Sequence, residues 1–168
     1  ETIKAEEESF KHKNSVYIRL TGSSNNPIIY NNDYKFRIGK CIELKKGKDV
    51  VIFACGAIIS EVLKASKILL KKGISVNVIN VHTVKPIDKK CIIEKVKGKK
   101  LIVSVEEHNI FGGLGSAIAE CLSNIKDVPR HLMLGINDKY SDGGDYKFLL
   151  NHYGITSIKI ANKIFKNF

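Results

Sequence analysis

The chain has 168 residues, 43% of them hydrophobic, and its 28 Lys and Arg residues outnumber 17 Asp and Glu residues, for a formal net charge of +11 at pH 7. This length and apolar content predict one buried core with some chain left over, and no apolar run approaches the roughly 18 residues of a membrane span. The positive charge is mostly lysine, is scattered in short pairs and lacks interleaved stacking aromatics, so we expect no binding to nucleic acid or membranes.

The start of the chain and its cysteines bear on where the protein works. The chain begins with Glu1 and not Met, and Glu1–Phe10 holds no apolar signal region, so we expect a piece of a longer protein or a trimmed form of one. The cysteines lie in apolar runs without the close spacing of zinc sites or redox dithiols. We therefore predict no metal site, reduced and buried thiols, and a cytoplasmic location. The cysteines are Cys41, Cys55, Cys91 and Cys121.

The first 33 residues are predicted to lie outside the main domain. Residues 1–14 are charged without a clear period, so we expect a frayed or artificial start. Val16–Leu20 alternates like a short strand. Thr21–Pro27 is small, polar and proline-terminated, as in a linker. The main domain is expected to begin near Tyr34.

Beyond residue 40, apolar strands alternate with amphipathic helices. Val50–Cys55 is apolar on both faces, which indicates a strand covered by helices on each side. The short link 45–48 predicts that the strand before it is antiparallel to this one. Strands are predicted at 41–44, 50–55, 76–81, 101–105 and 132–136, and helices at 58–72, 88–96, 113–125, 145–153 and 157–165.

This alternation determines the expected fold class. Strands that alternate with helices form right-handed crossovers and a parallel sheet. We therefore predict an α/β protein, a three-layer α/β/α sandwich whose five-stranded sheet is mostly parallel with one antiparallel strand.

Three ionisable residues follow the strand at 101–105, at the edge where open α/β sheets usually meet ligands and partners. Glu106, Glu107 and His108 could form an acid/base set, because His beside carboxylates titrates near neutral pH. Adjacent residues on an extended chain point to opposite sides, so at most Glu106 and His108 share a face. The alternative is polar contacts at a loop or subunit seam. We predict no catalytic residue within this chain.

A glycine cluster, Gly112–Ser116, follows where a helix begins. Free backbone N–H groups there could cradle a phosphate, but the dinucleotide pattern requires a small residue where Ile118 stands. A tight turn with close helix–strand packing is the favoured interpretation. Gly113 and Gly115 would also let a partner backbone approach, and the apolar Phe111 on the same loop favours a partner surface.

Two other possible functional sites each lack a residue that their chemistry requires. Asp138, Asp142 and Asp145 are not followed by the terminal Glu of a calcium loop, so a turn and an Asp-capped helix explain them better. Cys55 has no base placed for it, so we interpret it as a core thiol.

Five stretches in a fixed order carry a family resemblance. They are Gly47–Gly56, Gly73–Asn80, Thr83–Asp88, Val105–Ser116, and Leu134–Asp138 with Tyr153–Thr156. Together they resemble the C-terminal domain of transketolases and their thiamine-diphosphate-dependent relatives. The resemblance covers about residues 16–165.

The resemblance implies a three-domain transferase that moves two-carbon ketol units between sugars. Its first two domains bind thiamine diphosphate, a divalent metal ion and the sugar, while the last domain braces the dimer and the middle domain. We therefore expect this chain alone to bind no cofactor, to be inactive, and to need its N-terminal domains or a separate N-terminal subunit. Residues 1–33 would hold the end of the preceding, pyrimidine-binding domain with a tail and linker, and residues 34–168 the transketolase C-terminal-type domain.

The glycines and Phe111 of this stretch predict a homodimer or weak self-association with residues 106–116 at or beside the contact. The resemblance implies that the partner there is the same domain of a second subunit or the middle domain. The candidates for an interface or substrate edge are Glu106, Glu107, His108, Phe111, Gly112, Gly113, Gly115 and Ser116. No catalytic, cofactor-binding or metal-ligating residue is predicted.

One position departs from the family. Transketolases commonly carry an arginine that binds the sugar phosphate where counting places Gly22, and Arg19 lies three positions earlier. Either the register differs, or the substrate is not the usual phosphorylated ketose. The 1-deoxyxylulose-5-phosphate synthases and the β subunits of 2-oxo acid dehydrogenases share the Glu-Glu and glycine features and stay alternative parents, as does a stand-alone α/β interaction module.

Overall fold

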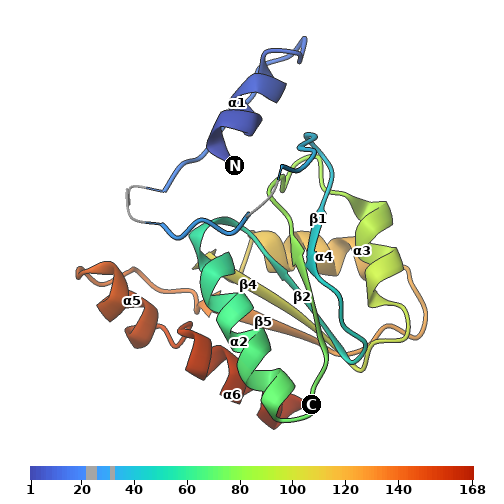
Figure 1. Ribbon diagram of the computed structural model, residues 1–168, viewed down its shortest axis with the longest axis vertical. Helices are drawn as coiled ribbons and strands as arrows, with labels where there is room; N and C mark the ends of the chain where they lie inside the picture. The colour runs from blue at the N-terminus through green and yellow to red at the C-terminus, as the bar shows by residue number, and fades with distance from the viewer. Residues whose placement is uncertain (22–25, 31–32) are drawn as a thin grey trace.

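A computed structural model describes residues 1–21, 26–30 and 33–168 (Figure 1). The strands are β1 (Ile42–Lys45), β2 (Val50–Ala54), β3 (Val76–Asn80), β4 (Leu101–Asn109) and β5 (His131–Ile136). The helices are α1 (Thr2–Ser9), the 3-10 turn η1 (Gly56–Ile58), α2 (Ile59–Lys71), α3 (Lys89–Val96), α4 (Leu114–Leu122), α5 (Tyr146–His152) and α6 (Ser157–Asn167). The strands form one sheet in the order β1-β3-β2-β4-β5.

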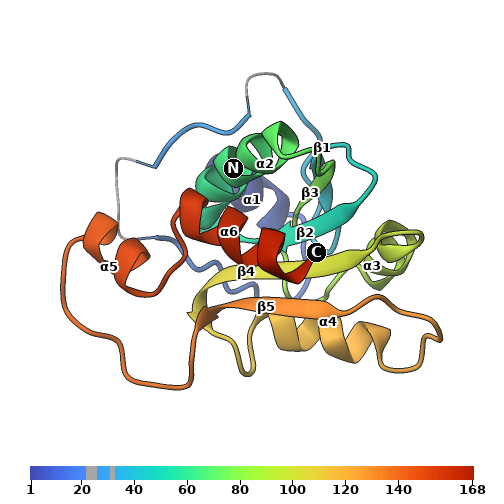
Figure 2. The same cartoon turned by 90° about the horizontal axis from the view of Figure 1, so that it is seen from below.

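The predicted three-layer sandwich is confirmed. Helices α2 and α6 cover one face of the sheet, and α3 and α4 cover the other (Figure 2). Alternate residues of β2 supply both cores: Val50 and Ile52 pack towards α2 and α6, whereas Val51 and Phe53 pack towards α3 and α4. All five residues of this strand are buried, which is why its sequence is apolar throughout.

The first strand is antiparallel, as predicted, but its predicted partner is wrong. β1 pairs with β3, with Ile42 opposite Asn80, and β2 lies between β3 and β4. The link between β1 and β2 therefore crosses the start of β3. Gly47 allows this crossing, because a Cβ there would lie 2.1 Å from the carbonyl carbon of Val76. Two strand spacings amount to about 9.6 Å, which a link of four residues can span.

Two expectations for the N-terminal segment are wrong. Residues Thr2–Ser9 form a helix, because Glu, Lys and Ala are good helix formers, and Lys4 Nζ lies 2.5 Å from Asp33 Oδ1. Val16–Leu20 is exposed and forms no strand, because β1 and β5 are the edges of the described sheet and neither pairs with it. Helix α1 projects beyond the carboxyl edge of the parallel strands (Figure 1). Most of the expected linker, Thr21–Pro27, falls outside the described residues.

Strand β4 is longer than predicted. It continues past Val105 to Asn109, so the three ionisable residues lie on the strand and not in a loop after it. Its pairing with β5 is irregular between Val105 and Asn109.

The four cysteines are free thiols. Cys121 is buried as predicted, but Cys41, Cys55 and Cys91 are only half-buried. These three lie at the ends of elements: Cys41 directly precedes β1, Cys55 directly follows β2, and Cys91 is in the first turn of α3.

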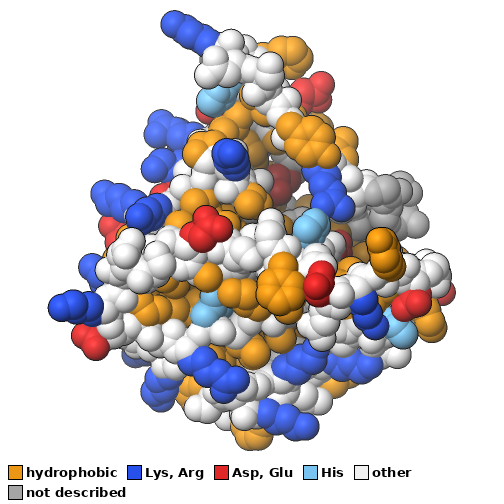
Figure 3. Space-filling model, turned by 180° about the vertical axis from the view of Figure 1, so that it is seen from behind, with side chains coloured by type: hydrophobic (Ala, Val, Ile, Leu, Met, Phe, Trp, Pro, Cys, Tyr) orange, Lys and Arg blue, Asp and Glu red, His pale blue; other side chains and the backbone are white. Residues whose placement is uncertain are grey.

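Among the described residues, no single basic band crosses the face opposite that of Figure 1. There, lysine and arginine side chains are dispersed around apolar ones (Figure 3). Within the described part of the chain, every helix is too short or too polar to span a membrane.

Candidate functional site

Glu106 occupies the centre of the connection between β4 and α4. Its side chain is only 2% exposed. Its carboxylate accepts the Leu114 N–H at 2.7 Å through Oε2 and the Gly115 N–H at 2.8 Å through Oε1. The first amides of a helix have no partner within it, and the positive end of the helix dipole favours a carboxylate. Glu106 therefore stabilises the start of α4.

The glycines of this turn are required by their own chain. A Cβ on Gly113 would lie 2.0 Å from Glu106 Oε2, and one on Gly115 would lie 2.8 Å from Ser104 Oγ. Gly112 has φ +72°, in the left-handed region that side chains disfavour. The close approach that the sequence suggested for a partner backbone is thus made by β4 itself.

Glu107 contacts a different element from Glu106. The Tyr146 hydroxyl of α5 donates to Glu107 Oε1. Burial raises the pKa of Glu107, and the Tyr146 hydrogen bond and the charge of Arg19 oppose that rise. Arg19 itself is exposed.

The acid/base set that the sequence analysis considered, Glu106 with His108, does not come together within this chain. Glu106 is buried and held by two amides, whereas His108 is exposed and its Nδ1 lies 2.9 Å from the Asn109 carbonyl oxygen. Burial raises the pKa of Cys55 to about 12. That thiol is therefore protonated at neutral pH and a poor nucleophile.

The rest of the turn is held by Ser116 and presents Phe111 to solvent. Ser116 Oγ accepts the Gly112 N–H at 2.9 Å and donates to the Ile110 carbonyl at 3.2 Å. The Phe111 side chain is 64% exposed. An open groove of about 610 Å³ lies beside the turn, between it and the segment Val84–Lys89.

Sequence reasoning missed a second polar group at the same sheet edge. Asn80 ends β3 fully buried, and its Nδ2 donates to the Tyr30 hydroxyl at 2.6 Å and to the Glu1 carboxylate. His82 stacks on Phe36 with ring centroids 4.0 Å apart, and burial lowers its pKa. The signal was the pair of asparagines, Asn77 and Asn80, within a strand whose other residues are apolar.

Of two further expectations, one can be placed in the structure. Asp145 caps α5, because its side chain accepts the Phe148 N–H at 2.9 Å, as the sequence indicated. Gly22, which stands where the resemblance expects an arginine, lies outside the described residues.

The glycine turn does not fit a diphosphate group. The amides of Leu114 and Gly115 that could hold one are already bonded to Glu106. The carboxylate also places a negative charge where the anion would lie. The thiamine diphosphate implied by the family resemblance therefore has no cradle in this turn.

Comparison with known proteins gives a consistent result. Residues 39–160 match the family described as "Transketolase, C-terminal domain". The chain is 38% identical over 156 residues to a "Putative transketolase C-terminal section" of Methanocaldococcus jannaschii, covering 92% of this chain and 48% of that protein. It is 38% identical over 133 residues to a 1-deoxy-D-xylulose-5-phosphate synthase of Caldanaerobacter subterraneus, covering 79% of this chain and 21% of that enzyme.

A solved structure agrees with these sequence matches. The protein described as "Split gene transketolase, inactive beta4 tetramer" superposes with a TM-score of 0.77 at 34% identity, covering 83% of this chain and 46% of that one. The chain thus spans about half the length of the first relative and of this solved structure, and about a fifth of the synthase.

Proposed function

Because the chain belongs to the transketolase family through its C-terminal domain, we propose that it is the C-terminal domain or subunit of a thiamine-diphosphate-dependent transferase that moves two-carbon ketol units between sugars. Its role in that enzyme is to brace the assembly. The observation that carries this role is the turn around Glu106, whose buried carboxylate and first helix amides are bonded to one another. The buried carboxylate of this turn therefore serves as a structural support for α4.

The partners follow from the same proposal. The cofactor, its divalent metal ion and the sugar bind to N-terminal domains or to a separate N-terminal subunit. The match to a protein named as a C-terminal section and to a split-gene transketolase described as an inactive tetramer supports a separate subunit and an inactive isolated chain. Free thiols are typical of a reducing compartment, which supports a cytoplasmic location.

Activity tests the proposal directly. The chain is purified alone and together with the thiamine-diphosphate-binding section encoded in the same genome, and two-carbon transfer from a ketose phosphate to an aldose phosphate is followed. We expect activity only from the mixture. Activity of the chain alone would contradict the proposal.

The donor substrate that the mixture uses distinguishes between the possible parent enzymes. Turnover by the same mixture with a 2-oxo acid and not with a ketose phosphate would identify a 1-deoxyxylulose-5-phosphate synthase or 2-oxo acid dehydrogenase, which the match to the synthase keeps open. Turnover with neither donor, and no complex between the two sections, would favour a stand-alone interaction module.

We further propose that residues 106–116 lie at or beside a homodimer contact. Phe111 is 64% exposed on a turn that its glycines and Ser116 hold rigid, and exposed apolar groups on a fixed surface favour association. Phe111→Asp should place a charge in the contact and weaken self-association at least about tenfold, the effect of roughly 1.4 kcal/mol.

A matched control exists for this variant. Ile158 on α6 is equally exposed, at 63%, and lies outside the proposed contact. Sedimentation equilibrium should show weaker dimers for Phe111→Asp and unchanged dimers for Ile158→Asp, with the same circular dichroism for both. A wild-type chain that stays monomeric at high concentration would refute the contact.

A further inference from the structure

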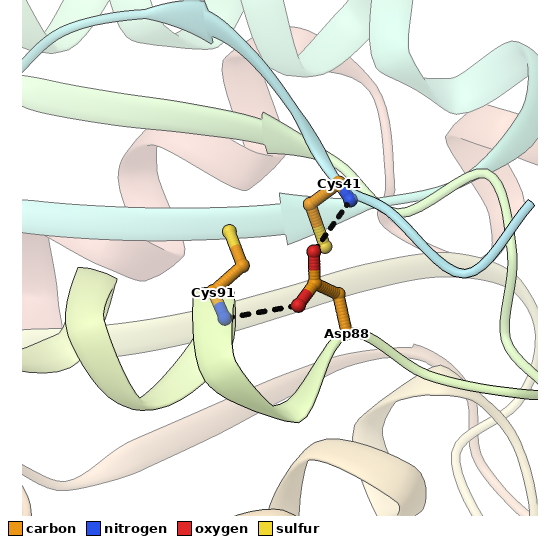
Figure 4. Close-up of side chains that lie close together, drawn as sticks. All are labelled: Cys41, Asp88 and Cys91. Carbon is orange, nitrogen blue, oxygen red and sulfur yellow. Dashed lines mark hydrogen bonds between the residues drawn. The ribbon is translucent and has the colours of Figure 1, made fainter. Parts of the chain in front are cut away.

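Two cysteines that are far apart in the chain meet one carboxylate on the α3 side of the sheet. Cys41 directly precedes β1, and Asp88 and Cys91 belong to the start of α3 (Figure 4). One ligand atom from each, the two Sγ atoms and a carboxylate oxygen, lie within 4.8 Å of one another. The two cysteines are 50 residues apart in the sequence, so their spacing does not indicate a shared site. The tertiary fold brings the start of β1 beside α3.

Asp88 is held in place by the backbone N–H groups of both cysteines. Its Oδ1 accepts the Cys91 N–H at 3.1 Å, as the N-terminal cap of α3, and its Oδ2 accepts the Cys41 N–H at 3.2 Å. Each carboxylate oxygen has two lone-pair positions, so each retains one after these bonds. The side chain is 9% exposed, which leaves it a fixed donor beside two half-buried thiols.

We propose that Cys41, Asp88 and Cys91 form a binding site for a thiophilic divalent metal ion, Zn²⁺, with a water molecule as fourth ligand. Two thiolates and a carboxylate are established zinc ligands, and thiolates select against Mg²⁺ and Ca²⁺. In a tetrahedral site with Zn–S distances of about 2.3 Å, the sulfur atoms are about 3.8 Å apart. The three ligand atoms, all within 4.8 Å of one another, are therefore within about 1 Å of that spacing.

The charges around the cluster suit a bound dication. Two thiolates and one carboxylate carry three negative charges, of which Zn²⁺ neutralises two. Lys40 Nζ lies 3.8 Å from Asp88 Oδ1, and the N-terminus of α3 adds partial positive charge beside Cys91.

The proposed ion would link the edge strand to the helix layer. β1 pairs with β3 on only one side, and Cys41 is the residue directly before it. An ion that joins Cys41 to Cys91 fixes the start of β1 against α3. Bound zinc should therefore stabilise the folded chain, because the unfolded chain does not hold the three ligands together.

The test uses the full 168-residue chain, reduced with a non-thiol reductant and stripped of metal. Zn²⁺ affinity is measured by competition with a chromophoric chelator, and Co²⁺ is used as a spectroscopic probe. We expect one zinc ion per chain, a thiolate-to-cobalt charge-transfer band, and a higher melting temperature with zinc. Cys41→Ser and Cys91→Ser should each lose more than the roughly 100-fold in affinity that removal of an outer-shell partner costs at most.

Two variants make the result specific. Asp88→Asn keeps a good cap for α3 but lowers zinc affinity, and Cys55→Ser changes a half-buried thiol elsewhere and should bind zinc as the wild type does. Circular dichroism checks that each variant folds. Equal zinc affinity in the wild type, Cys41→Ser and Cys91→Ser, or a cobalt spectrum without the thiolate band, would overturn the proposal. So would a Cys41–Cys91 disulfide that forms in preference to zinc binding.

Discussion

The replacement of Glu106 tests the structural role of the turn most sharply. Its carboxylate makes two hydrogen bonds to buried amides at the start of α4. Hydrogen bonds to a charged group contribute roughly 1.5–3 kcal/mol each. Glu106→Ala removes both and leaves two amides without partners, so we expect a loss of about 3–6 kcal/mol in the free energy of unfolding. That is a large part of the roughly 5–15 kcal/mol that holds a domain folded.

Glu106→Gln separates charge from shape. The amide keeps one acceptor oxygen, but its NH₂ group faces the second backbone N–H, so one bond is lost and two donors oppose each other. We expect a loss of about 2–3 kcal/mol. Urea unfolding followed by circular dichroism measures both variants, and Glu120→Gln, on the exposed side of the same helix, is the control. A loss below about 0.5 kcal/mol for Glu106→Gln would refute the role assigned to this carboxylate.

Three further outcomes are expected. Gly113→Ala should lower the free energy of unfolding by about 1–3 kcal/mol, because the added Cβ would lie 2.0 Å from Glu106 Oε2, whereas Gly143→Ala, with no atom within 4 Å, should change it little in urea unfolding. Phe53→Ala, in the fully buried β2, should cost about 3–5 kcal/mol in the same assay, and a cost below 1 kcal/mol would contradict its burial. Burial lowers the pKa of His131 to about 4, below its value of about 6.5 in the unfolded chain. The unfolded chain therefore binds the proton more readily, and stability falls as the pH drops from 6.5 towards 4, by about 2 kcal/mol between pH 7 and 4.5. His131→Gln should reduce this pH dependence, and an unchanged dependence in acid unfolding curves would contradict the assignment.

Much of the fold could be predicted because its signals are local. The apolar run at Val50–Ala54 and the alternation of strands with amphipathic helices give the layers and the order of elements, since burial on two faces requires apolar side chains at every position. Asp145 and Asp88 were likewise readable as helix starts, because a cap acts within three residues. Errors at element ends were of one to four residues, as for β4, where charged side chains continue the strand.

The candidate site could be located but not interpreted from sequence. The stretch 106–116 does lie at the carboxyl end of β4, as predicted. The direction of the Glu106 side chain depends on how α4 packs back on the strand. The same packing brings the amides of Leu114 and Gly115 to its carboxylate. The sequence made the glycines candidates for a partner contact, whereas the structure shows that the chain's own turn requires them.

The sequence by itself determined the fold class, the family and the position of the charged strand end, because hydrophobic period, caps and motif order are properties of neighbouring residues. Only the tertiary structure decided three other features. They are the pairing of β1 with β3, the capping of α4 by Glu106, and the meeting of Cys41 with Cys91. The first and the last join segments that are far apart in the chain through the sheet order, which is set by how the whole core packs. The capping depends on how α4 packs back on β4. A link of a few residues between β1 and β2 allows β1 to pair with either β2 or β3. Which of the two it pairs with therefore depends on how the buried faces of β3 and β2 pack.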